Sequence, residues 1–169
     1  MNRNKFLKPV LIVAVVVVIC VFAFLAVWNT KGKAPNLIEY KNDEYGFSFA
    51  LPESWKGYTI VIDKWEGFDV DRSSDTPSQL GPIIKIRNPN WTEQNPYQDI
   101  PIMVFTLEQW QEVSNEKLSV SAAPMPPTEL GRNSKYVFAL PARYNYSYPT
   151  GWEEVDQIMK NNPLKTFNP

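Results

Sequence analysis

The feature that most constrains this chain is an uncharged run of 19 residues from Val10 to Trp28. Fourteen of these residues are Leu, Ile, Val or Phe. At about 1.5 Å of rise per residue, the run forms a helix of about 28 Å, close to the roughly 30 Å hydrocarbon core of a bilayer. The sequence therefore predicts one transmembrane helix over 10–28, preceded by a basic tail over 1–9 and followed by a polar linker over 29–36.

The charges on either side of the run predict its orientation. Arg3, Lys5 and Lys8 precede it, and positive charge of this kind favours the cytoplasmic side. Lys31 and Lys33 follow it and weaken the bias. A cleaved signal peptide is the alternative, but its apolar region would span only about 7–15 residues. We expect a single-pass protein of the cell membrane with a cytoplasmic N-terminus and an external C-terminal domain.

The composition of the region over 37–169 excludes several function classes. This region has the usual size of one domain. It carries 18 acidic and 12 basic residues, a net charge of −6, which repels nucleic acid. The chain contains no histidine, and its one cysteine, Cys20, lies in the apolar run. These absences exclude Ser-His-Asp and Cys-His catalysis and metal sites built on His or Cys, so we expect no cofactor.

Apolar residues alternate with polar ones along several stretches, which is the pattern of strands with one buried face. The first stretches predict an antiparallel hairpin over 37–51 and a strand over 58–62. No period is visible over 63–82 or 88–99, where we expect long loops. The later predicted strands are 83–87, 100–105, a hairpin over 129–140, and a strand over 144–148 whose Tyr144, Tyr146 and Tyr148 face a helix.

Two capping boxes predict helices. In the first, the Thr106 hydroxyl and the Gln109 amide satisfy free amides at the start of a helix over 107–117. In the second, Thr150 and Glu153 begin a last helix that stops before Pro163. Six or seven sequential antiparallel strands with two late helices predict an α+β domain.

Three stretches resemble the PsbP-like family, which is named for an extrinsic subunit of the photosystem II oxygen-evolving centre. They are Tyr45–Phe49 with Leu51, Pro52 and Trp55; Lys135–Phe138; and Ile158–Lys160 with Leu164–Phe167. The resemblance implies an α/β/α sandwich, in which an antiparallel sheet lies between layers of helices. It also implies an extracytoplasmic binding or assembly protein without established catalysis. No functional residue is carried over from the family, and nothing in this chain indicates photosynthesis.

One acidic cluster is a candidate metal site. Asp69, Asp71 and Asp75 alternate as oxygen ligands do at positions 1, 3 and 5 of a calcium loop. The glycine position of such a loop is occupied by Ser74, and the position of the closing acid by Leu80. The pattern is therefore incomplete, and a solvated acidic loop is the favoured interpretation.

Two further groups of residues suggest functions of different classes. Asp63 and Glu66 could pair with Asp69 as glycosidase-type carboxylates, which must lie about 5–10 Å apart. Trp65, Trp91 and Tyr97 fall in predicted loops and are candidates for an exposed binding surface, with a role at the edge of the core as the alternative.

The sequence therefore favours a membrane-anchored external binding or assembly module that is not an enzyme. Its expected partner is a membrane protein or a cell-surface polymer. A carboxylate-based hydrolase of a cell-surface polymer is the alternative. Acids that converge in one cleft would favour the hydrolase, and acids spread into solvent would favour the binding module.

Overall fold

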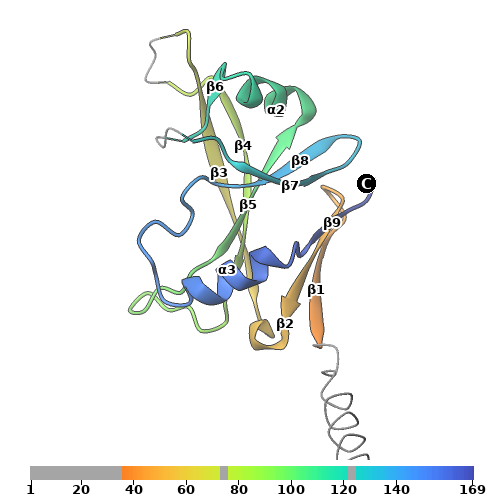
Figure 1. Ribbon diagram of the computed structural model, residues 1–169, viewed down its shortest axis with the longest axis vertical. Helices are drawn as coiled ribbons and strands as arrows, with labels where there is room; N and C mark the ends of the chain where they lie inside the picture. Colours follow the sequence, from red (N-terminus) through yellow and green to blue (C-terminus); the bar gives the residue numbers. More distant parts are fainter. Residues whose placement is uncertain (1–35, 73–75, 122–124) are drawn as a thin grey trace, which may run out of the picture. The chain divides into compact units, whose positions relative to one another are not determined.

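The computed structural model describes residues 36–72, 76–121 and 125–169, which all belong to one compact unit (Figure 1). The elements of this unit are, in chain order, β1 (Leu37–Asn42), β2 (Phe47–Pro52), the 3-10 helix η1 (Glu53–Trp55), β3 (Thr59–Asp69), β4 (Gln79–Arg87), β5 (Ile100–Thr106), α2 (Leu107–Ser114), β6 (Leu118–Ser119), β7 (Thr128–Arg132), β8 (Tyr136–Leu140), α3 (Trp152–Lys160) and β9 (Leu164–Thr166).

The strands form two antiparallel sheets, with the orders β1-β2-β9 and β6-β3-β4-β5-β8-β7. The predicted first hairpin is confirmed, because β1 pairs with β2 from Leu37↔Pro52 to Asn42↔Phe47. The predicted late hairpin is also confirmed as β7 and β8. Strand β9 joins the other side of β2, so the C-terminal segment completes the smaller sheet.

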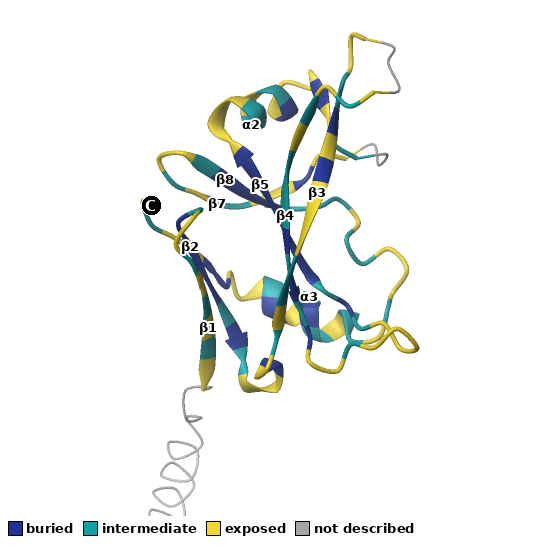
Figure 2. Cartoon of the chain, turned by 180° about the vertical axis from the view of Figure 1, so that it is seen from behind, coloured by how far each residue is buried: buried dark blue, intermediate teal, exposed yellow. Residues whose placement is uncertain are grey.

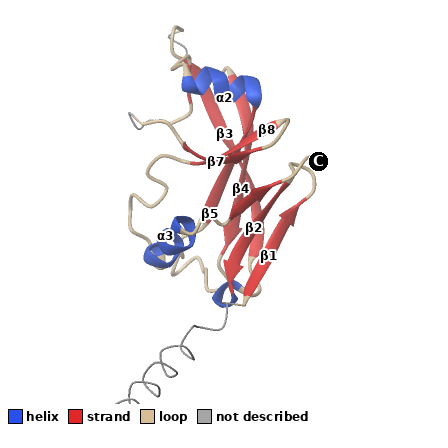
Figure 3. Cartoon of the chain, turned by 45° about the vertical axis from the view of Figure 1, so that its right-hand side comes forward, coloured by secondary structure: helices blue, strands red, loops and turns tan. Residues whose placement is uncertain are grey.

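The loop predicted over 63–82 is wrong over most of its length. Strand β3 continues to Asp69 and β4 begins at Gln79, and the two pair without interruption from Thr59↔Arg87 to Gly67↔Gln79. They are the longest strands in the part of the chain that the structure describes (Figures 1 and 3). Polar residues follow one another along β3 because both of its faces are largely exposed between Ile62 and Lys64.

The six-stranded sheet is apolar on both faces at its centre, and β5 and β8 are dark blue along most of their length in Figure 2. One face packs with β2, η1, β9 and α3 into the main core. The other face packs with α2 and β6 into a second cluster. The buried residues of the main core are Phe47, Phe49, Leu51, Trp55, Ile84, Ile86, Ile100, Ile102, Val104, Phe138, Val155, Ile158 and Leu164. Those of the second cluster are Trp65, Met103, Phe105, Val113, Leu118, Val137 and Ala139.

The predicted α/β/α sandwich is wrong. The main core is closed chiefly by a second sheet, and each of the two α-helices is short, with eight residues in α2 and nine in α3. The described chain is therefore a mostly antiparallel β-structure with a curled larger sheet. Apolar residues over 47–55 and 158–167 do pack together, but across two sheets and not between helical layers.

The predicted transmembrane helix is not supported. Its residues, 10–28, lie outside the described ones, as do the predicted tail over 1–9 and the linker up to residue 35. Within 36–72, 76–121 and 125–169, no helix is long and apolar enough to cross a membrane.

The helix starts differ from each other. At α2 the first capping box is confirmed. The Gln109 backbone N–H donates to the Thr106 hydroxyl at 3.1 Å, and the Gln109 side-chain oxygen accepts from the Thr106 backbone N–H. The second capping box is wrong. Gly151, at φ 81°, occupies the N-cap of α3, and the Thr150 hydroxyl donates instead to the Asn95 side chain.

Candidate functional site: a tyrosine surface on two joined loops

Trp65 was a candidate for the exposed binding surface, and it is buried. It lies in β3 and is only 2% exposed. Its indole N–H donates to the Val104 carbonyl at 2.9 Å, and its ring stacks on Phe105 with 4.6 Å between the centroids. The ring covers Gly81, where an added Cβ would lie 2.3 Å from it. The interpretation of Trp65 as an exposed aromatic is therefore wrong, and its role is to fill the second cluster.

The candidate metal ligands do not form a site among the described residues. Asp69 accepts a hydrogen bond from the Asp71 N–H at 3.1 Å and pairs with Arg72 at 3.4 Å. Asp75 lies outside the described residues. In the part of the chain that the structure describes, no group of three or more His, Cys, Asp or Glu is placed to hold a metal ion.

The three acids considered for a hydrolase are spread along β3. Asp63 and Asp69 are six residues apart on an extended strand, which separates them by about 20 Å, and Glu66 points to the opposite face. Asp63 also forms an ion pair with Lys85, whose Nζ lies 2.5 Å from Oδ2. This hydrogen bond lowers the pKa of Asp63, and the Lys64 backbone N–H lowers it further. Asp63 and Asp69 are therefore farther apart than glycosidase carboxylates, and Glu66 faces away from both.

The second predicted surface segment, 88–99, is a loop as expected, and it is joined to the loop over 141–151. The Gln98 N–H donates to the Thr150 carbonyl at 2.8 Å, and Tyr97 and Thr150 form a parallel bridge. The Thr150 hydroxyl donates to the Asn95 side chain at 3.1 Å. The two loops lie side by side next to the start of α3 (Figures 1 and 2).

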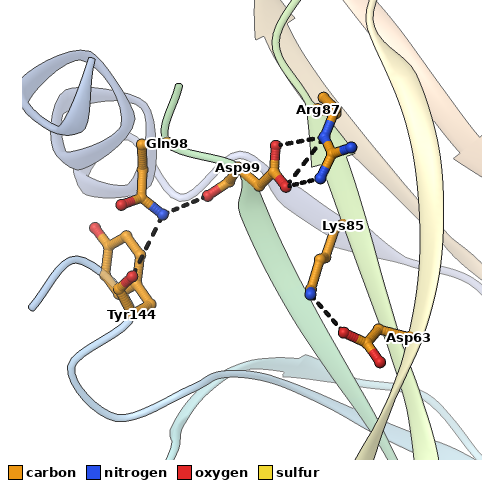
Figure 4. A network of polar contacts seen from close by, with 6 residues as sticks. All are labelled: Asp63, Lys85, Arg87, Gln98, Asp99 and Tyr144. Atoms are coloured by element: carbon orange, nitrogen blue, oxygen red, sulfur yellow. Dashed lines mark hydrogen bonds and ion pairs between the residues drawn. The ribbon is translucent and has the colours of Figure 1, made fainter. Parts of the chain in front are cut away.

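Buried polar contacts hold this junction from beneath. The Gln98 side chain is 6% exposed, and its amide donates to the backbone carbonyls of Asp99 and Tyr144 at 2.7 and 3.3 Å (Figure 4). Asp99 receives the Arg87 guanidinium, with 2.9 Å between Nη2 and Oδ2. This contact raises the pKa of Arg87. The guanidinium carbon also lies 3.9 Å from the centroid of Trp91, so half-buried Trp91 shields an ion pair.

Tyr97 fixes the start of α3. Its ring occupies the space that a side chain on Gly151 would need, because an added Cβ would lie 1.9 Å from the ring. Its hydroxyl donates to the Glu154 carboxylate at 3.2 Å. Burial raises the pKa of Tyr97, and the negative charges of Glu154 and Glu153 raise it further. Half-buried Tyr97 thus contacts Glu154 and lies near a second acid, Glu153.

Two tyrosines that the sequence placed against a helix are the most exposed aromatic residues of these loops. Tyr146 is 73% exposed and Tyr148 is 67% exposed, so the strand predicted over 144–148 is wrong. Successive turns carry them outward, with Tyr146 N–H donating to the Arg143 carbonyl and Tyr148 N–H to the Asn145 carbonyl. The φ angles of Arg143 and Tyr148 are 55° and 47°, a left-handed conformation that is uncommon outside glycine.

We call Tyr97, Tyr146, Tyr148 and Trp152 together the tyrosine surface. Tyr148 packs edge-on against half-buried Trp152, with 5.0 Å between the ring centroids. The signal for this surface was present in the sequence. Pro141, Pro149 and Gly151 flank the tyrosines, and residues of these types favour turns over a strand that continues across them.

The comparisons with known proteins add no relative to this description. No family model matches the chain, and neither the curated proteins nor the solved structures yield a match. The resemblance to the PsbP-like family is thus untested by them and stays a hypothesis.

Proposed function

We propose that the domain is a binding module without catalytic activity, and that the tyrosine surface is its contact with a partner protein. The observation that carries the proposal is the outward position of Tyr146 and Tyr148 on loops tied to the domain by buried hydrogen bonds. Large aromatic side chains on a supported loop provide contact area with little loss of side-chain entropy on binding. Partner contacts concentrate on such loops.

The alternative of a carboxylate hydrolase receives less support from the geometry. Asp63 forms an ion pair with Lys85, and the length of β3 between them separates it from Asp69. Acids spread in this way fit a binding module better than a paired general acid and base. The identity of the partner as a membrane protein or a cell-surface polymer, and the location of the domain outside the cell, stay predictions.

Site-specific photo-cross-linking tests this function. A photoreactive phenylalanine analogue is placed at position 146 in cells that produce the protein, and at position 107 as a control, where Leu107 is also exposed on the described surface. We expect a discrete protein adduct from position 146 and none from position 107. The adduct should be lost when Tyr148→Asn is added, because this change removes a ring of the tyrosine surface. Asparagine is used because it tolerates the left-handed conformation of residue 148. Equal adducts from both positions, or none from position 146, would contradict the proposal.

A further inference from the structure

Two acidic residues at the start of α3 have no basic partner among the described residues. Glu153 and Glu154 begin α3. Glu154 accepts hydrogen bonds from two neutral groups, the Ser54 hydroxyl at 2.6 Å and the Tyr97 hydroxyl at 3.2 Å. Within the described residues, neither glutamate forms an ion pair, whereas Asp99 pairs with Arg87 and Asp156 with Lys160. Two carboxylates without a basic partner therefore lie at the start of α3, where one of them contacts Tyr97.

The rings of these loops already receive cations from their own chain. The Arg87 guanidinium lies over Trp91 at 3.9 Å, and that of Arg143 lies 5.8 Å from the centroid of Tyr146. A cation over the face of an aromatic ring is attracted by the negative potential of that face. Tyr148 is exposed, and no described residue places a cation over its ring. Since it packs against Trp152, the residue before Glu153, it presents an exposed ring at the start of α3.

We propose that the partner reaches this site with a segment rich in Lys or Arg, whose cations contact the ring of Tyr148 and the carboxylates of Glu153 and Glu154. This inference rests on the proposed function and adds the chemistry of the partner. Charge complementarity carries it, because an aromatic face and carboxylates without a basic partner both favour a cation. The net charge of −6 over residues 37–169 also accelerates encounter with a basic partner. A neutral glycan would use the rings but leave both carboxylates without an opposite charge.

Fluorescence anisotropy with defined probes tests the inference. The full 169-residue chain, kept in a mild non-ionic detergent, is titrated into a labelled peptide of alternating lysine and serine. Parallel titrations use a peptide of alternating glutamate and serine, and a labelled neutral oligosaccharide such as chitohexaose. We expect binding of the lysine peptide only, and we expect added salt to weaken it, because ions screen exposed charges.

Matched variants separate a site from a general effect of charge. Glu153→Gln should weaken binding of the lysine peptide about threefold, and Tyr148→Asn about two- to fivefold, as expected for an exposed cation–π contact. Glu108→Gln is the control, because Glu108 is also an acid in the first turn of a helix, α2, but lies away from the tyrosine surface. It should leave the affinity unchanged.

Several outcomes would overturn the inference. If Glu108→Gln weakens binding as much as Glu153→Gln, the peptide senses only net charge. If the glutamate peptide binds as well as the lysine peptide, the carboxylates play no part. If chitohexaose binds and Tyr146→Ser abolishes that binding, the surface serves a sugar. The proposed function fails separately, when position 146 yields no protein adduct. If an adduct forms and survives the double change Glu153→Gln with Glu154→Gln, the domain is still a binding module, but its partner is not recognised by basic residues.

Discussion

At the scale of single residues, Trp65 and Trp91 show how one residue type serves two purposes. Trp65 is buried, hydrogen-bonded to Val104 and stacked on Phe105. Trp65→Ala should therefore lower the free energy of unfolding by about 3–5 kcal/mol, the usual cost of truncating a buried aromatic residue. Trp91 is half-buried over Arg87, and Trp91→Ala should cost about 1 kcal/mol. Urea unfolding of both variants measures the difference, and losses of equal size would contradict these assignments.

The ion pair of Asp63 and Lys85 makes a prediction about pH. Its hydrogen bond lowers the folded-state pKa of Asp63 below the unfolded value of about 4. The pair therefore adds stability above that pH, and the contribution is lost as the pH falls through the folded pKa. Because both side chains are partly exposed, it amounts to less than about 1 kcal/mol. Lys85→Met should raise the pKa of Asp63 in an NMR titration, whereas Lys41→Met, which removes the partner of Asp43, should not.

At the scale of elements, the sequence predicted those strands that have one buried face. The pattern of Phe47, Phe49 and Leu51 located β2 because these side chains enter the main core. It failed for the second half of β3, where Asp63 and Lys64 are both exposed and the buried positions beyond them are only Trp65 and a glycine, Gly67, which gives no apolar signal. It failed in the opposite way at 144–148, where tyrosines alternate with polar residues in turns. The loop over 88–99 was predictable, but its contact with 141–151 depends on pairing that no local pattern reports.

The long strand β3 also carries a prediction of its own. Its pairing with β6 covers only Phe68 and Asp69, so within the described residues the outer edge over 59–67 has no strand partner. Charged residues on such an edge oppose pairing with other chains. Lys64→Ile would extend the exposed apolar surface of Ile62, which is 63% exposed. We expect the variant to associate with rising concentration in analytical ultracentrifugation, and Lys64→Arg to match the unchanged chain. If Lys64→Ile also matches it, the edge is protected by other means.

At the scale of the whole molecule, the two sheets meet along β7 and β9, and this seam was not visible in the sequence. The strands are 32 or more residues apart in the chain, and side chains of β9 pack on Gly131, where an added Cβ would lie 3.2 Å from the Leu164 side chain and 3.3 Å from that of Thr166. The Thr166 hydroxyl donates to the Arg132 carbonyl at 2.9 Å. The sequence showed separate hairpins with apolar faces. Their arrangement as two sheets depends on long-range contacts of this kind, which no local pattern reports. A sandwich with helical layers was therefore wrongly expected.

Asn133 connects the segments that meet where the two sheets join. Its side-chain amide donates to the carbonyls of Tyr45 at 2.8 Å and Phe167 at 3.0 Å, and its side-chain oxygen accepts from the N–H groups of Lys135 and Tyr136 at 2.9 Å. One side chain thus joins the turn between β7 and β8, the turn between β1 and β2, and the C-terminal segment. Because its loss leaves several backbone groups without partners, Asn133→Ala should lower the free energy of unfolding by about 2–3 kcal/mol.

Two further variants define the reason for that loss. Asn133→Asp keeps the oxygen that accepts from Lys135 and Tyr136 but removes the bonds that the amide donates, so it should also be clearly destabilising. Asn168→Ala is the control, since its side chain accepts one exposed hydrogen bond from the Ser134 N–H at 3.2 Å, and it should cost less than about 1 kcal/mol. Urea unfolding of all three measures the order. If Asn133→Asp is as stable as the unchanged chain, the donated bonds do not hold the sheets together, and the packing of Leu164 against Gly131 must do so instead.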